Sequence, residues 1–365
     1  MNYEPVDRVP NHEVGVWAQT KQRWQQEGLA THDLHWDWFV GDPYWDLDPR
    51  EYIKVRTDMY PPYEEKVLSR EGETETILRS NGVVSKALIT GTAEGMRMSM
   101  DEYISFPVET PEDFAELKQR YRAESAVRYP AYWEEMLLPG WQVREHPLIL
   151  GENVSIQGYY WRAREWMGTE NLSYGWYDEP EMMHEMMEFI TEFTVAVTRP
   201  FLESGVNPDY VFINEDLSMK TGPLLSPNTY AEFILPELKK LVAYFKSHGV
   251  QWVVIDTDGN PELVIPHFLD AGVDGIWPLE RAANMDPMAL RQKFGRDLRL
   301  WGGVDKMELA KDTAAIDAHL ETLRPLVEEG GFIPTVDHLV PPDVPLANFE
   351  HYMRRKRQLL RGEAF

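Results

Sequence analysis

Six short apolar runs, separated by longer amphipathic segments, fill the chain from about residue 146 onward. The runs are PLILGE, DYVFINED, WVVIDTDG, GVDGIWPLE, LRLWGGVD and GGFIPTVDH. The segments between them have helical periodicity, as in residues 227–247, where Ser226 is a capping residue and a proline occupies the first helical position. Apolar strands that alternate with amphipathic helices predict a parallel sheet covered by helices.

Polar residues follow nearly every apolar run. The alternation of strands and helices allows either a closed barrel or an open doubly wound sheet, and these polar residues favour the barrel. A closed (β/α)8 barrel gathers functional residues at the C-terminal ends of many strands, whereas a doubly wound sheet concentrates them at one switch point. No G-x-G-x-x-G turn follows a strand. We therefore predict an α/β fold, a TIM barrel, with residues 8–17 as a seventh strand and the eighth unassigned. The strand-end residues are Glu152, Asn214, Glu215, Asp216, Asp256, Asp258, Glu280, Asp305, Asp337 and His338.

We predict a single barrel domain that spans residues 1–365, in which the N-terminal part is an addition to the barrel. Residues 1–60 are rich in Trp, Tyr, Asp and Pro, which predicts an irregular and helical layer. Residues 64–90 alternate apolar and polar side chains, which predicts a three-stranded antiparallel meander. Its Asn81-Gly82 pair is typical of a type I′ hairpin turn.

Charge and cysteine content exclude several classes of partner and site. A formal charge of −25 argues against nucleic acid or an anionic membrane, because both favour basic surfaces. The 365 residues include no cysteine, so disulfides, thiolate nucleophiles and thiolate metal sites are impossible. No N-terminal apolar region and no run of transmembrane length is found, so we expect a cytoplasmic protein.

Several long segments resemble the uroporphyrinogen decarboxylase superfamily. They include WMGTENLSYGWYDEPEMMHEMMEFI, GPLLSPNTYAEFILPELKKLV, DTDGNPELVIPHFLDAGVDGIWPLE, LWGGVDKMELAKD and GGFIPTVDHLVPPDVPLANFEHYM, and the likeness runs in order from about residue 8 to 362. The resemblance implies a TIM barrel and one of two activities. These are decarboxylation in the haem pathway and methyl transfer that depends on a corrinoid.

The sequence departs from both branches at functional positions. The decarboxylase motif R-Q-A-G-R-Y is missing; the corresponding region reads GVWAQTKQRWQQEGL, in which Arg23 is only a distant candidate. The methyltransferases bind zinc through a His-x-Cys pair and a later Cys. Here these positions read Asp256-Thr257-Asp258 and PTVDHLVPP, so the thiolate site is absent in its usual form.

The replacing residues predict another metal site. Glu215, Asp258 and His338 end three different strands, and two carboxylates with one imidazole can hold a divalent metal, zinc being favoured. We also predict His338, Asp256 and Asp258 as catalytic groups, because residues 256 and 258 point the same way on a strand. The alternatives are a hydrogen-bonded loop histidine for His338, and an Asx-turn or helix cap for the aspartates.

Residues near the same strand ends are candidates for substrate binding. Tyr159, Tyr160 and Trp161 follow an apolar run, where they either wall a pocket or pack in the core. Asn214 and Glu280 end strands. Lys306 either meets an anionic group or forms a rim salt bridge with Asp305.

The resemblance and the residues together predict a metal-dependent methyltransferase. It would move a methyl group between a corrinoid carried by a partner protein and a small acceptor or donor, and the resemblance further implies a homodimer. Two rival functions are decarboxylation of a tetrapyrrole or smaller acid, and a non-catalytic barrel that binds a tetrapyrrole or other ligand. An arginine cluster at the barrel mouth would favour decarboxylation, and a mouth lined by acids and aromatics would count against it.

Overall fold

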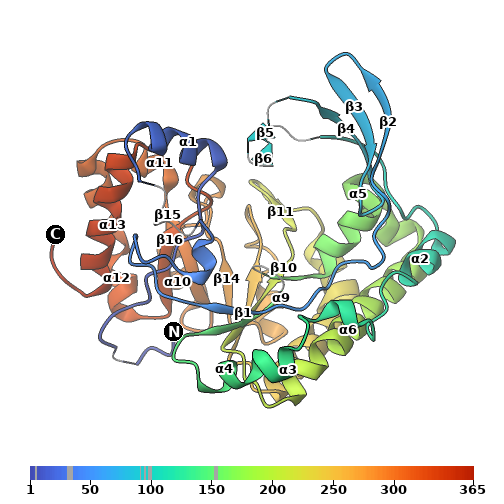
Figure 1. The fold of residues 1–365 in the computed structure, drawn as a ribbon. Coiled ribbons are helices and arrows are strands. Elements are labelled where there is room, and N and C mark those ends of the chain that lie inside the picture. The colour runs from blue at the N-terminus through green and yellow to red at the C-terminus, as the bar shows by residue number, and fades with distance from the viewer. Residues whose placement is uncertain (5, 31–35, 91, 94–95, 98–100, 152–154) are drawn as a thin grey trace.

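The computed structural model describes residues 1–4, 6–30, 36–90, 92–93, 96–97, 101–151 and 155–365 (Figure 1). Of the strand-end residues, Glu152 lies outside these ranges. No helix among the described residues is both long and apolar enough to cross a membrane.

A curled parallel sheet forms the centre of the molecule (Figure 1). All six predicted strands are present, and the predicted α/β barrel fold is confirmed. The strands are hydrogen-bonded in chain order, and the short β9 (Ile156–Gln157) pairs with one of them. In that order they are β1 (Glu51–Ile53), β8 (Leu148–Leu150), β10 (Tyr210–Asn214), β13 (Trp252–Asp256), β14 (Gly275–Trp277), β15 (Arg299–Val304) and β16 (Phe332–Val336).

The first strand of the sheet is β1, so the prediction of a strand at residues 8–17 is wrong. That segment makes only an isolated bridge, between Val16 and Val340. On the other side of this segment, the N–H of Asp48, which lies just before β1, donates to the Asn11 carbonyl at 2.9 Å. Residues 9–16 therefore lie between the two ends of the strand order, β16 and β1, without forming a regular ladder.

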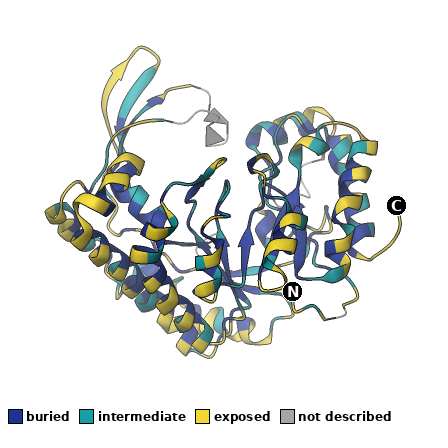
Figure 2. Cartoon of the chain, turned by 180° about the vertical axis from the view of Figure 1, so that it is seen from behind, coloured by how far each residue is buried: buried dark blue, intermediate teal, exposed yellow. Residues whose placement is uncertain are grey.

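Helices cover the outer face of the sheet, with exposed residues on their outward sides (Figure 2). The predicted helix at 227–247 is present, but a π-helical segment at Tyr230–Ile234 interrupts it. The outer helices include α5 (Tyr159–Asp178), α6 (Pro180–Glu203), α8 (Leu235–Ser247), α9 (Ile265–Asp270), α10 (Pro287–Phe294), α12 (Thr313–Glu329) and α13 (Leu346–Leu360). Their placement leaves the ends of the barrel free for loops.

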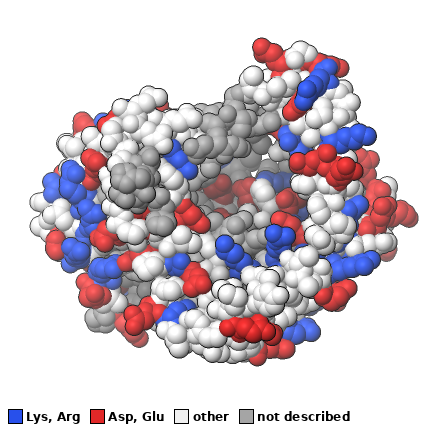
Figure 3. Space-filling view, in the orientation of Figure 1, with Lys and Arg blue, Asp and Glu red and all other residues white. Residues whose placement is uncertain are grey.

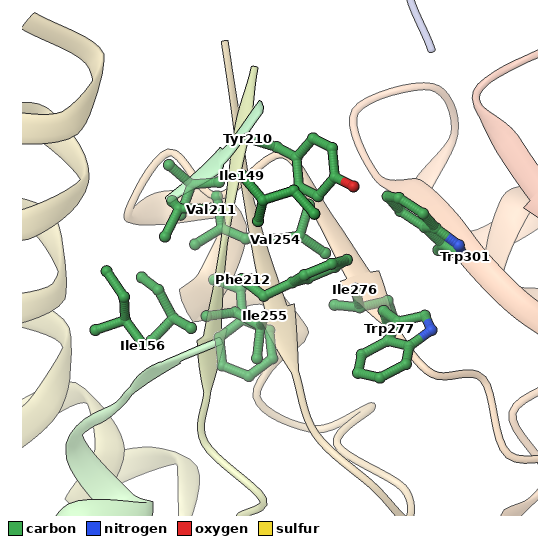
Figure 4. Close-up of a cluster of buried hydrophobic side chains, with 14 of the residues drawn as sticks. Ile149, Ile156, Tyr210, Val211, Phe212, Val254, Ile255, Ile276, Trp277 and Trp301 are labelled. Carbon is green, nitrogen blue, oxygen red and sulfur yellow. The ribbon is translucent and has the colours of Figure 1, made fainter. Parts of the chain in front are cut away.

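Large aromatic side chains fill the inside of the curled sheet (Figure 4). Phe212 lies 5.2 Å, between ring centroids, from both Trp277 and Trp301, and Tyr210 packs edge-on to Trp301. Burying an apolar side chain of this size is worth about 1.5–3 kcal/mol relative to exposure. The barrel interior is thus a packed core and supports the residues at its mouth.

A buried ion pair joins the N-terminal segment to the barrel. The Lys356 ammonium lies 2.5 Å from Glu13 Oε1, and neither side chain is more than 1% exposed. Tyr352 donates a hydrogen bond to the same oxygen, and the N–H of Val336 donates to Glu13 Oε2 at 2.9 Å. Glu13 therefore links residues 9–16, α13 and β16 through one carboxylate.

A small antiparallel sheet stands beside the mouth of the barrel, opposite α1 (Ala18–Gln26), as Figure 1 shows. The predicted meander is confirmed as β2 (Lys66–Glu71), β3 (Thr74–Leu78) and β4 (Val84–Leu88), and β7 (Glu102–Ser105) adds a fourth strand. The predicted type I′ turn is wrong. Gly82 has a positive φ of 86° but Asn81 does not, and the Arg79 N–H closes a longer loop by donating to the Val83 carbonyl.

Candidate active site

A cavity of about 350 Å³ opens at the C-terminal ends of the parallel strands. In Figure 3 the molecule is hollowed between the antiparallel sheet and α1, and acidic side chains are visible in the hollow. The cavity brings together five of the predicted site residues: Trp161, Asn214, Asp256, Asp258 and His338. The other described lining residues are Val14, Phe39, Ser155, Asp216, Trp277, Pro278 and Leu339.

Strand register explains why the acids meet. Asn214 at the end of β10 pairs with Asp256 at the end of β13. Side chains two residues apart on an extended chain point the same way, which places Asp258 on the side of Asp256. Asp216 lines the same cavity. Asp216 has a positive φ of 34°, and Arg164 holds it there by donating to its carbonyl at 3.1 Å and to Oδ2 at 2.6 Å.

His338 and Asp258 form an ion pair at the mouth. The His338 Nε2 lies 3.7 Å from Asp258 Oδ2, and the Trp17 ring stacks on the imidazole with 6.1 Å between centroids. Burial works against the charged imidazole, but the carboxylate of Asp258, with a smaller contribution from Glu280, outweighs it and raises the pKa of His338 above its ordinary value. His338 thus holds a proton to a higher pH than a free histidine.

We expect Asp258→Asn to lower the pKa of His338, because the substitution removes the charge that favours the imidazolium. The titration of the His338 ring in an NMR pH series measures this, with His338→Gln to assign the signal. In the wild type, the ion pair stabilises the fold at pH values below the ordinary pKa of histidine. This stabilisation is lost as the pH rises through the raised pKa of His338. An unchanged His338 titration in Asp258→Asn would contradict the ion pair.

Asp256 has no cationic side chain as a partner among the described residues. Burial, followed by repulsion from Asp258 and Asp216, raises its pKa well above the ordinary value, and a hydrogen bond with Ser155 opposes the shift only in part. Asp256 therefore enters the cavity as a carboxyl group that is hard to ionise without a positive neighbour.

Glu215, predicted as a metal ligand, does not point into the cavity. It is fully buried, and its Oε2 accepts a hydrogen bond of 2.7 Å from the Tyr160 N–H at the start of α5. A Cβ on Gly158 would lie 2.7 Å from the Glu215 carboxyl carbon, so glycine leaves room for this contact. Burial raises the pKa of Glu215 to about 7. Glu215 caps the helix on the side of the strand opposite to Asn214 and Asp216.

The three predicted metal ligands thus do not converge. Asp258 and His338 share the cavity, whereas Glu215 lies behind it. Within the described ranges, no group of three or more His, Asp or Glu side chains is arranged to hold a metal ion. The donor set does not fit the predicted zinc site.

Two of the three predicted aromatic wall residues belong to the core. Tyr159 and Tyr160 are at most 1% exposed, and the Tyr159 hydroxyl hydrogen-bonds with Thr191 inside the molecule. Trp161 lines the cavity, and the Arg164 guanidinium lies 4.5 Å above its ring centroid. Of the three residues, Trp161 alone lines the cavity.

Glu280 and Lys306, predicted to bind substrate, form part of the loop framework beside the cavity. The Lys306 ammonium lies 3.3 Å from Asp337 Oδ1 and 3.7 Å from Glu280 Oε1. Glu280 also accepts a hydrogen bond from the N–H of Gly259. Asp305, the alternative partner of Lys306, accepts from the Met307 N–H instead. These contacts hold the loops after β13, β14 and β15 together.

Several lining residues were missed by the sequence analysis. Trp277 is the last residue of β14, so the rule that favoured the other strand ends could have found it. Asp216 was named as a strand-end residue but not as a site residue. Ser155 lies between two short strands. Val14 and Phe39 come from the N-terminal layer, where no periodicity indicates which side chains face the barrel.

Comparison with known proteins gives this site a family context. A uroporphyrinogen decarboxylase from Myxococcus xanthus is 25% identical over 171 residues, which cover 46% of each chain. The methylated-thiol–coenzyme M methyltransferase of Methanosarcina mazei is 23% identical over 190 residues, covering 51% of this chain and 47% of that protein. The chain therefore spans about half the length of the curated relatives that it matches.

A solved structure supports the fold, and a family model shows the family. A methyltransferase from Methanosarcina mazei superposes with a TM-score of 0.59 over 97% of this chain and 95% of that one; at 17% identity this likeness concerns the fold alone. The model of the uroporphyrinogen decarboxylase (URO-D) family matches residues 159–359, which is more than half of the chain and includes all the acidic residues of the cavity. The chain belongs to the uroporphyrinogen decarboxylase family, which includes both decarboxylases and a methyltransferase.

Proposed function

We propose that the protein is a methyltransferase that moves a methyl group between a small molecule bound in the cavity and a corrinoid carried by a partner protein. The observation that carries the proposal is the lining itself. The described lining residues comprise three aspartates, one histidine, one serine, one asparagine and six aromatic or apolar side chains, with no lysine or arginine. Uroporphyrinogen has eight carboxylates and would require several convergent cations. The chemistry of the cavity therefore favours the methyltransferase branch, to which one relative belongs.

His338 is the proposed acid–base group. When a methyl group leaves the small molecule, the electron pair of the broken bond stays on the leaving atom. The protonated His338 gives that atom a proton, and Asp258 stabilises the imidazolium beforehand. In the opposite direction His338 takes the proton from an acceptor. Trp161 and Trp277 form part of the cavity wall beside this exchange.

The proposed mechanism includes no step at a metal, because the predicted ligands do not fit one. Glu215 already accepts a hydrogen bond at the α5 N-terminus and lies away from the cavity. The two remaining predicted ligands, Asp258 and His338, pair with each other. Methyl transfer is expected to continue after treatment with a chelator. A loss of activity that zinc restores would contradict this part of the proposal.

The experiment that tests the function follows an isotopically labelled methyl group. The protein is incubated with reduced cobalamin and a panel of methyl ethers, methylated thiols and methylammonium salts, before and after chelator treatment. We expect label to appear on cobalamin with at least one donor. Release of carbon dioxide from uroporphyrinogen, without methyl transfer, would replace the proposal with decarboxylation. Tight binding of a tetrapyrrole without turnover of any substrate would favour a binding barrel.

A further inference from the structure

We propose that the small molecule is an organic ammonium cation, which binds with Asp256 as its counter-ion and the aromatic residues of the cavity as its walls. The inference rests on the proposed function and names the substrate class for the same site. It is based on the charged side chains that face the cavity and on the apolar character of the cavity walls.

Two of the three cavity aspartates already have cationic partners. Asp216 pairs with Arg164 at 2.6 Å, and Asp258 pairs with His338 at 3.7 Å. Asp256 is different, because the described part of the chain offers it no lysine, arginine or histidine within ion-pair distance. Its polar neighbour is Ser155, and its charged neighbours Asp258 and Asp216 both repel a carboxylate. The cation that would complete this arrangement must come from the ligand.

The walls indicate which kind of cation fits. Phe39, Trp161 and Trp277 line the cavity, and aromatic faces attract ammonium groups through their quadrupoles. The protein already uses this interaction, since the Arg164 guanidinium stacks on Trp161 with 4.5 Å to the ring centroid. A bare divalent ion requires several converging oxygen or nitrogen donors, which the described side chains do not form. An ammonium with methyl or other alkyl substituents matches both the aromatic walls and the single free carboxyl.

The state of Asp256 adds a measurable consequence. Burial and the two neighbouring carboxylates raise the pKa of Asp256 and favour its protonated form. A bound cation favours the carboxylate, so we expect binding to release a proton at pH values where Asp256 is protonated beforehand.

Methyl transfer from such a ligand is balanced by the corrinoid, which takes the methyl group, and by His338, which supplies a proton. Methyl transfer breaks the N–CH₃ bond and leaves the electron pair on nitrogen, while the methyl group goes to the reduced corrinoid. The neutral amine product then takes the proton of His338 and leaves as an ammonium ion.

Isothermal titration with choline and with 3,3-dimethylbutan-1-ol tests the inference, because these molecules share one shape and differ in charge. We expect choline to bind at least about tenfold more tightly than the neutral alcohol, as cation–π and counter-ion contacts require. In two buffers with different heats of ionisation, choline binding should release a proton and alcohol binding should not. Equal affinities for the two molecules, or no binding of choline, would overturn the inference.

A pair of variants tests whether Asp256 is the residue that binds the cation. Asp256→Asn keeps the shape of the side chain and is expected to weaken choline binding at least about tenfold and to abolish proton release. Asp270→Asn makes the same change at an outer helix, where Asp270 pairs with Lys239, and should leave both unchanged. Choline binding that survives in Asp256→Asn contradicts the role of Asp256. Methyl transfer from ethers or thiols, without choline binding, would reject the substrate class and leave the proposed function intact.

Discussion

Lys356→Met is expected to lower the free energy of unfolding by about 3–5 kcal/mol, because it leaves the Glu13 carboxylate buried without its counter-ion. The two charges lie 2.5 Å apart and are shielded from water on all sides. Methionine is close to lysine in length and is apolar, so the loss reflects the missing charge more than a cavity. Chemical denaturation, followed by tryptophan fluorescence, measures the change.

Two further variants separate this charge effect from other causes. Lys239→Met removes an exposed lysine that also pairs with an aspartate, and its cost should stay below about 1 kcal/mol. Adding Glu13→Gln to Lys356→Met removes the uncompensated charge and should recover part of the stability. If Lys356→Met costs no more than Lys239→Met, then Glu13 is neutral in the folded protein and the link between residues 9–16, β16 and α13 is not ionic.

The parts of the fold that could be predicted are those with strong periodicity. The six strands after residue 146 each combine an apolar run with a polar end, and all six form, as does the meander at 64–90. The seventh strand was misplaced because residues 8–17 have an apolar pattern, whereas β1 is only three residues long and begins beside Arg50, a buried residue. A strand that short depends on its partner β8 for its register, and a tertiary contact of this kind has no local signal.

The site illustrates the same limit at the level of single side chains. Asp256 and Asp258 were assigned to one side by the alternation of a strand, and both line the cavity. Glu215 was chosen for its charge, although the same alternation sets it apart from Asn214 and Asp216. Its burial depends on Gly158, a residue distant in sequence whose missing side chain admits the carboxyl group. The acidic mouth could thus be predicted from the strands, and the same alternation argues against Glu215 as a ligand. The buried contact of Glu215 with Gly158 has no such signal in the sequence.

His338→Gln is expected to lower the kcat of methyl transfer by about 10²–10⁴-fold, the usual contribution of a positioned acid or base. Glutamine keeps a polar side chain at the same place next to Asp258 but cannot give up or accept a proton in the working pH range. The measurement is the initial rate with a labelled methyl donor over a range of donor concentrations, so that kcat and KM are obtained separately. His351→Gln, on the outer helix α13 and paired with Asp317, is the matched control and should leave both constants unchanged.

The split between the two constants decides what His338 does. A lower kcat with little change in KM means that the imidazole acts when the methyl group moves, since the lost interaction belongs to the transition state. A higher KM with unchanged kcat would make His338 a binding residue, and the proton would then have to come from another group. Asp258→Asn separates these cases further. Because Asp258 raises the pKa of His338, this variant should move the alkaline fall of the rate to lower pH only if His338 is the acid.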